Sequence, residues 1–324
     1  MVTPFESLKQ RDAAFICHTY GRYPLDVARA KGSRVWSSDG REYIDLLTGI
    51  AVTGLGHCND EVTEVIREQA GKLVHTCNLV YQKEQIDLAE KLLSTAHFGK
   101  VFFCNSGAEA NEAAIKIARR YMQKVRKTDA TDIITLKNAF HGRTLGTVAA
   151  TGQPAYQDGF APMPGGFVQV PWGDLKALEA AITPRTVGVL AEIVQGESGI
   201  LPMPAEYAKG IEALCRAKGI LFIVDEVQAG MCRSGRFWSF QRFGLKPDVI
   251  SCAKAIANGL PMGAMMATDE VAQAFEPGTH GTTFGGNALI SAVACKVIDI
   301  MRRDKLDERA DRVGEACRAR LRAV

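Results

Sequence analysis

The chain has 324 residues, of which 47% are hydrophobic and 23% are charged, as is usual for a globular protein. Its net charge of +3 is too weak for this length to indicate a nucleic-acid or membrane-surface binding protein. There is no run of 18 apolar residues, and the opening MVTPFESLKQRDAAF lacks the apolar core of a signal peptide. We therefore expect a cytoplasmic protein with no membrane span.

The nine cysteines form no C-x-x-C pair, and their number is odd. This usage favours the reducing cytosol over a disulfide framework, and we expect most of the thiols to be buried apolar side chains. The six histidines show no metal-ligand spacing, and the adjacent His57 and Cys58 have no second pair to complete a site. We therefore expect no metal.

The first predicted element is a β-hairpin over 35–47, with Asp39-Gly40 as its two-residue turn. Helices and short apolar strands then alternate. The predicted helices are 61–73, 83–93, 108–125 and 207–219, the last of them ended by Gly219. The predicted strands are 100–104, 132–137, 187–194, 220–227 and 248–254.

Continuously apolar strands that alternate with helices indicate an α/β fold with a mostly parallel, covered sheet. Such sheets bind ligands beyond the carboxyl ends of their strands. Asp225 ends the apolar run LFIVD, and Lys254 ends the next strand, DVISCAK. A carboxylate that leaves a buried strand needs a partner. That partner is either a structural cation such as Arg233 or a cationic ligand.

A third feature lies after strand 100–104, where Ser106, Gly107 and Ala108 open a helix. The first backbone N–H groups of a helix can bind an anion such as phosphate. The alternative is an ordinary turn capped by Asn105 or Ser106. The nucleotide-binding patterns G-x-x-x-x-G-K-[ST] and G-x-G-x-x-G after a strand are both missing.

A phosphate cradle, a strand-end acid and a strand-end lysine together suit pyridoxal phosphate. Lys254 would form a Schiff base with the aldehyde of this cofactor, and Asp225 would keep the ring nitrogen protonated. A buried lysine otherwise needs to lose its charge or find a partner.

Five segments then resemble the successive motifs of one family. They are FFCNSGAEANEAAIKIARRY, FHGRTLGTVAATG, LFIVDEVQAGMCRSGRFWSFQ, KPDVISCAKAIANGLPMGAMM and GTTFGGNALISAVA. They resemble the class III, fold-type-I pyridoxal-phosphate aminotransferases, and within that class the acetylornithine aminotransferases, from Phe15 to the end of the chain. The resemblance implies a small-domain segment with the hairpin at 1–58, a large cofactor-binding domain at 59–287 and the start of a C-terminal domain at 288–324.

The resemblance also implies which residues hold the cofactor phosphate. The backbone of Gly107 and Ala108, next to Ser106, donates to it. Thr283 reaches the phosphate of a neighbouring subunit, which implies a homodimer with shared active sites.

The cofactor ring would be held by four further residues. Phe140 stacks on the ring, Asp225 pairs with its nitrogen, and Gln228 lies near its phenolic oxygen. Lys254 carries the Schiff base and, once freed by substrate, acts as general base and then as acid.

For the substrate, the resemblance implies that Arg143 grips the carboxylate and that Thr282 lies against it. Glu197 resembles a gating glutamate that pairs with an arginine of the C-terminal domain. The implied reaction moves the terminal amino group of N-acetylornithine to 2-oxoglutarate, giving N-acetylglutamate semialdehyde and glutamate in arginine biosynthesis. Rival substrates are ornithine, succinylornithine, 4-aminobutyrate and diaminopimelate derivatives. A metal or thiol enzyme that uses the cysteines is a rival of another class.

The chain departs from the family pattern in two ways. Ala-Asn-Gly (257–259) and Cys232 stand where glycines are common, although Asn258 tolerates a left-handed backbone. The family also continues beyond residue 324, so we expect an incomplete C-terminal domain, and a non-catalytic cofactor-binding protein stays an alternative. The last segment predicts a helix with one apolar stripe that lacks part of its cover: Leu306, Ala310, Val313, Cys317, Leu321 and Val324.

Overall fold

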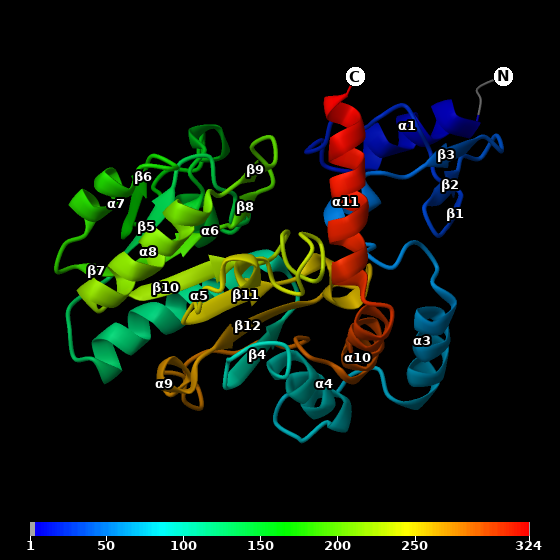
Figure 1. Cartoon of the computed structure of the whole chain (residues 1–324). Helices are drawn as coiled ribbons and strands as arrows, with labels where there is room; N and C mark the ends of the chain where they lie inside the picture. The colour runs from blue at the N-terminus through cyan, green and yellow to red at the C-terminus, as the bar shows by residue number, and fades with distance from the viewer. Residues whose placement is uncertain (1–3, 324) are drawn as a thin grey trace.

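A seven-stranded sheet lies at the centre of the protein (Figure 1), whose described residues are 4–323 in this computed structural model. In spatial order its strands are β4 (Lys100–Cys104), β12 (Gly263–Ala267), β11 (Val249–Cys252), β10 (Leu221–Asp225), β7 (Thr186–Ala191), β5 (Asp132–Leu136) and β6 (Phe167–Val170). Only β12 runs antiparallel to its neighbours in this sheet. The mostly parallel α/β sheet predicted from the sequence is confirmed.

Helices cover both faces of the sheet (Figure 1). Helix α5 (Gly107–Arg120), extended by a π-helical turn (Tyr121–Val125), connects β4 to β5, and α8 (Ala205–Lys218) connects β7 to β10. These connections cross the sheet in opposite directions, so right-handed crossovers place their helices on opposite faces. The other helices are α1 (Pro4–Phe15), α2 (Thr48–Ala51), α3 (Asp60–Lys72), α4 (Lys83–Leu93), α6 (Leu145–Ala150), α7 (Leu175–Ala181), α9 (Asp269–Ala272), α10 (Ala288–Arg303) and α11 (Leu306–Arg322).

The predicted helices and strands agree with the structure because their local signals are strong. All five residues of β10 are buried, as expected for a strand covered on both faces. Helix α8 ends at Gly219, whose left-handed φ of 66° lets its N–H bond the Arg216 carbonyl. The predicted strand over 187–194 divides into β7 and a short β8 (Val194–Gln195), which pairs with β9 (Leu201–Pro202).

Strand β12 was not predicted, because its sequence GAMMA has no β-branched residue. It lies buried between β4 and β11, and the position of Gly263 has no room for a side chain. A Cβ on Gly263 would lie 2.2 Å from the Ser106 carbonyl oxygen. Packing against its neighbours therefore decides the conformation of this segment, and strand propensity does not.

The N-terminal hairpin is confirmed, but its turn is longer than predicted. It belongs to a small sheet of β1 (Arg29–Lys31), β2 (Arg34–Trp36) and β3 (Glu42–Ile44). The Ser37 N–H bonds the Arg41 carbonyl, which leaves three residues in the loop. Gly40 takes the left-handed position, with φ 86°. A two-residue type I′ turn would need positive φ at both Asp39 and Gly40, and Asp39 does not have it.

The C-terminal stripe forms helix α11, which stands away from the sheet in Figure 1. Asp311 holds it to the rest of the protein through ion pairs with Arg236 at 3.4 Å and Arg242 at 2.6 Å. No residue of α11 is buried, and the Val313 side chain is 49% exposed. The last member of the stripe, Val324, lies outside the described residues.

All nine cysteines lie in the described part of the chain and are free thiols. The prediction that most are buried is wrong. Four are buried, namely Cys104, Cys215, Cys232 and Cys252. The exposed ones lie outside the central sheet and the helices that pack on it, where no apolar core forms around them.

The two adjacent acids after β10 have separate surroundings. Glu226 points into the core, where it accepts hydrogen bonds from the Ser239 N–H (2.9 Å), the Ser239 hydroxyl (2.7 Å) and the Phe240 N–H (3.0 Å). Its role is to cap the 3₁₀ turn Ser239–Phe243. Burial outweighs these bonds and raises the pKa of the Glu226 carboxyl to about 7.

This raised pKa predicts a pH-dependent stability. The unfolded carboxyl ionises near 4.5, whereas the folded one keeps its proton to about 7, so the stability that Glu226 contributes falls as pH rises across this window. Glu226→Gln should reduce the fall in the free energy of unfolding by up to about 1.4 kcal/mol per pH unit. Denaturant unfolding at pH 5, 6 and 7 measures it. The exposed Glu206→Gln on α8 is the control. If the free energy of unfolding changes with pH equally steeply in wild type and Glu226→Gln, folded Glu226 is ionised over the whole range from pH 5 to 7.

Candidate active site

A cavity of about 340 Å³ opens at the carboxyl ends of β4, β10 and β11. This is where a mostly parallel sheet is expected to bind a ligand, and the volume suits a small molecule. Eight of the residues predicted for the site line it, namely Ser106, Gly107, Ala108, Phe140, Glu197, Asp225, Gln228 and Lys254.

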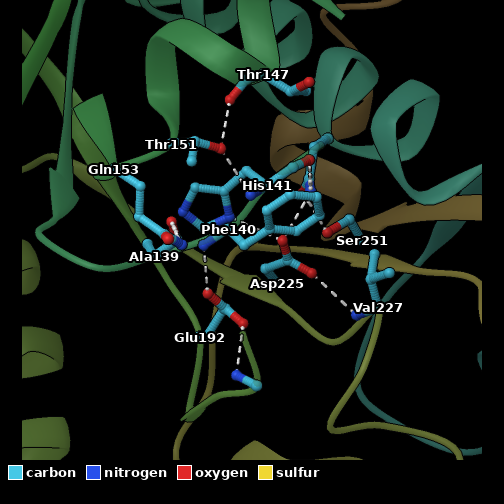
Figure 2. Close-up of polar contacts among 12 residues, drawn as sticks. Ala139, Phe140, His141, Thr147, Thr151, Gln153, Glu192, Asp225, Val227 and Ser251 are labelled. Carbon is cyan, nitrogen blue, oxygen red and sulfur yellow. Dashed lines mark hydrogen bonds and ion pairs between the residues drawn. The ribbon is translucent and has the colours of Figure 1, made fainter. Parts of the chain in front are cut away.

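Asp225 is buried at the end of β10 and held by three donors (Figure 2). Its Oδ2 accepts from Asn111 Nδ2 at 2.7 Å and lies 2.8 Å from His141 Nδ1, while its Oδ1 accepts from the Val227 N–H at 2.9 Å. A carboxylate has about four acceptor positions, so one stays available on the side of the cavity. Arg233, named as an example of the structural alternative, makes no ion pair with Asp225 among the described residues.

The residues around Asp225 form a buried polar network. Asn111 also donates to the His141 carbonyl at 2.8 Å and accepts from the Ser251 hydroxyl at 2.5 Å. Burial lowers the pKa of His141, but the hydrogen bond and charge of Asp225 outweigh it, so the pKa lies above its ordinary value. The network fixes the Asp225 carboxylate in one orientation. It also keeps the His141 imidazole, which can carry a proton, beside this carboxylate.

A second buried acid, Glu192, lies below Phe140 (Figure 2). Its carboxylate accepts from the Phe140 N–H at 2.9 Å and the Gly196 N–H at 3.4 Å. Burial raises the pKa of Glu192 to about 7, against the lowering effect of His141. Glu192 therefore ties the backbone of Phe140, and with it the position of the Phe140 ring, to the segment after β7.

Lys254 follows β11 and takes a left-handed backbone, with φ 51°. Such a conformation is costly for a residue other than glycine and is often found where a side chain must point in a required direction. Burial lowers the pKa of the Lys254 ammonium, although Asp225, Glu197 and Glu192 raise it. The cavity thus holds an amine that gives up its proton more easily than an exposed lysine.

The helix start at α5 forms the opposite wall. Ser106 caps the helix by accepting from the Glu109 N–H at 3.2 Å. The N–H groups of Gly107 and Ala108 come first in the helix, where an intrahelical acceptor is missing, so they can donate to an anion. A Cβ on Gly107 would lie 2.6 Å from Val227 Cγ1, so this wall needs glycine. Both the cap and the anion site predicted from the sequence are compatible with this geometry.

Gln228 and Glu197 meet at the rim of the cavity, where Gln228 Nε2 donates to Glu197 Oε1 at 3.0 Å. Gly196 makes this contact possible. A Cβ at position 196 would lie 1.6 Å from Gln228 Oε1 and would displace the amide.

Three predicted residues do not line the cavity but lie around it. Arg143 is exposed, and its guanidinium stacks on the Tyr156 ring at 3.8 Å. Thr282 Oγ1 accepts from Asn105 Nδ2 at 3.2 Å, next to the start of α5. Thr283 is exposed.

The departures from the family pattern fit the backbone. Asn258 is left-handed, with φ 47°, and its side chain accepts from the Leu55 N–H at 2.9 Å and donates to the Gly56 carbonyl at 3.1 Å. The prediction that Asn258 tolerates this conformation is confirmed. Cys232 is also left-handed, with φ 67°, which explains why glycine suits that position.

Sequence reasoning missed Asn111, His141 and Glu192. The available signal was a polar residue in an otherwise apolar stripe: Asn111 lies among the buried alanines of α5. Within residues 4–323 no cluster of His, Cys, Asp and Glu could hold a metal ion. No described helix is long and apolar enough to cross a bilayer.

Comparison of the chain with known proteins identifies its family. The family model described as aminotransferase class-III matches residues 15–324. The acetylornithine aminotransferase of Myxococcus xanthus is 44% identical over 319 residues, which cover 98% of this chain and 80% of the relative.

Two solved structures have the same fold. An ornithine aminotransferase from Toxoplasma gondii, with pyridoxal phosphate at partial occupancy in its active site, has a TM-score of 0.96 at 32% identity and covers 100% of this chain and 77% of its own. The acetylornithine aminotransferase of Elizabethkingia anophelis has a TM-score of 0.88 at 30% identity, with 99% of this chain and 79% of its own covered. The chain described here belongs to the class III aminotransferase family.

Proposed function

We propose that the protein is a pyridoxal-phosphate-dependent aminotransferase that moves the terminal amino group of N-acetylornithine to 2-oxoglutarate. The observation that carries the proposal is the convergence of Asp225, Lys254 and the start of α5 on one cavity. The acetylornithine specificity is supported by the Myxococcus xanthus relative, which is 44% identical. Products of the reaction are N-acetylglutamate semialdehyde and glutamate.

The residues present fit the cofactor. Asp225 has a free acceptor position for a protonated ring nitrogen, and its three donors prevent it from turning away. Phe140 offers a ring face, Gln228 an amide for the phenolic oxygen, and Ser106, Gly107 and Ala108 the phosphate cradle. Gly107 lets the start of α5 pack closely against Val227, at the wall of the cavity.

When bound, the cofactor supplies an aldehyde that accepts the amino group and a ring that takes up electrons. Lys254 would hold the cofactor through its amine and, when that amine is free, would carry the proton from the amine-bearing carbon of the substrate. Its lowered pKa suits both tasks, because the amine must be neutral to act as nucleophile or base. The Asp225 carboxylate lies at the end of the cavity where the positive charge of the ring nitrogen would need to be stabilised.

Arg143, Thr282 and Glu197 are proposed for the substrate. Arg143 docks the carboxylate, Thr282 lies beside it, and Glu197 controls entry at the rim. The bond from Gln228 to Glu197 supports this last role, since an exposed acid held at the rim can pair with an incoming cation.

We also propose a cytoplasmic homodimer. Thr283 is exposed beside the phosphate end, as expected for a residue that serves the neighbouring subunit. The nine free thiols are in keeping with a reducing compartment. The proposed domains are 1–58, 59–287 and 288–324, and the second contains every strand of the central sheet.

The test is an absorbance titration of the cofactor-loaded protein with N-acetylornithine, ornithine, succinylornithine, 4-aminobutyrate and N-succinyl-diaminopimelate. N-acetylornithine should convert the cofactor to its amine form with the highest kcat/KM, and 2-oxoglutarate should reverse the change. If another amine of this panel gives the highest kcat/KM, the protein is a class III aminotransferase with that amine as its substrate. Cofactor binding without conversion by any amine would support a non-catalytic protein.

A further inference from the structure

Arg143 is held in place by aromatic rings. Its guanidinium carbon lies 3.8 Å from the centroid of the Tyr156 ring and 5.5 Å from that of Phe140. These two rings meet edge to face, with centroids 5.7 Å apart. No carboxylate pairs with Arg143 among residues 4–323, whereas Arg119 and Arg120 on α5 both have polar partners.

This difference matters for binding an anion. In an arginine that already pairs with a carboxylate, part of the charge is neutralised and some of the N–H donors are occupied. A ring face attracts the guanidinium through its quadrupole but leaves the charge unneutralised and the in-plane N–H groups free. Stacking on Tyr156 therefore orders Arg143 and keeps its donors available to a planar carboxylate, which can accept two of them.

The Tyr156 ring is itself on a fixed support. It ends the short 3₁₀ turn Pro154–Tyr156, and glutamines on both sides anchor that turn. Gln153 Nε2 donates to the Ala139 carbonyl at 3.2 Å, and Gln157 Nε2 donates to the Val148 carbonyl at 3.1 Å. The turn is thus fastened to the segment that carries Phe140 and Arg143.

We infer that Tyr156 is a positioning residue for substrate: it holds Arg143 in an ordered and unpaired state that receives the carboxylate of the amino donor. This inference rests on the proposed function and adds a determinant of its specificity. Binding energy is gained because the arginine is ordered before the substrate arrives.

The test compares N-acetylornithine with N-acetylputrescine, its analogue without the carboxylate, on the cofactor-loaded enzyme. The carboxylate preference is the ratio of the two kcat/KM values. Tyr156→Ala should lower this ratio about tenfold through KM, whereas Tyr156→Phe keeps the ring and should stay within about twofold of wild type. In an Arg143→Ala background, Tyr156→Ala should lower the ratio no further, because the residue acts through Arg143.

A second measurement does not depend on turnover. Calorimetry with N-acetylnorvaline, which has the carboxylate but no reacting amine, should give about tenfold weaker binding to Tyr156→Ala and wild-type binding to Tyr156→Phe. An unchanged ratio and unchanged binding in Tyr156→Ala would overturn the inference, as would a further loss in the Arg143→Ala background. If no amine is turned over but N-acetylnorvaline binding still depends on the Tyr156 ring, the proposed function fails and the role of Tyr156 stands.

Discussion

Lys254→Ala should abolish the visible absorbance of lysine-linked cofactor and reduce transamination by about 10⁴-fold, since the same amine carries the cofactor and transfers the proton. No other lysine lines the cavity in the described part of the chain. Absorbance spectra of the loaded protein and single-turnover rates with N-acetylornithine measure the two losses.

This loss should not result from unfolding. Burial lowers the pKa of Lys254, so the folded protein bears a cost for the charged ammonium that alanine removes. The cofactor-free variant is therefore expected to be at least as stable as wild type in denaturant. Lys209→Ala, at an exposed position on α8, is the matched control and should keep both absorbance and rate. A Lys254→Ala protein that still transaminates would refute the assignment of this lysine.

The positions of Asp225 and Lys254 could be predicted because parallel strands bring their carboxyl ends to one edge. β10 and β11 pair with Asp225 opposite Ser251, three residues before Lys254. Once two buried strands were recognised in the sequence, their polar last residues had to lie near one another. The same reasoning placed the start of α5, which follows the end of β4, at this edge.

The support around Asp225 could not be predicted in this way. Asn111 and His141 reach it from α5 and from the segment after β5, at sequence separations of 114 and 84 residues. Hydrophobic periodicity carries no information about such pairings. The exact tilt of a helix over the sheet decides which of its side chains meets the acid. The cation–π support of Arg143 by Tyr156 depends in the same way on a short turn with no strong sequence signal.

Asp225→Asn should keep the cofactor on Lys254 but lower kcat by about 10²–10³-fold, the loss expected when one charge of a preorganised site is removed. The amide keeps the size of the carboxylate and an oxygen acceptor, so the cavity should retain its shape. It cannot carry the negative charge that holds a proton on the ring nitrogen. KM for N-acetylornithine should change little, because Arg143 and Thr282 are left intact. Steady-state kinetics on fully loaded protein measure both constants.

The matched control is another buried acid on the same pair of strands. Asp248 precedes β11 at the opposite edge of the sheet, where it pairs with Arg216 at 2.7 Å and accepts from the Phe222 N–H at 2.8 Å. Asp248→Asn should lower stability, because the charge that pairs with Arg216 and accepts from the buried Phe222 N–H is lost, but should leave kcat near that of wild type. If Asp225→Asn instead kept its rate, the acid at the cavity would be structural, and the proton on the ring would need a different partner.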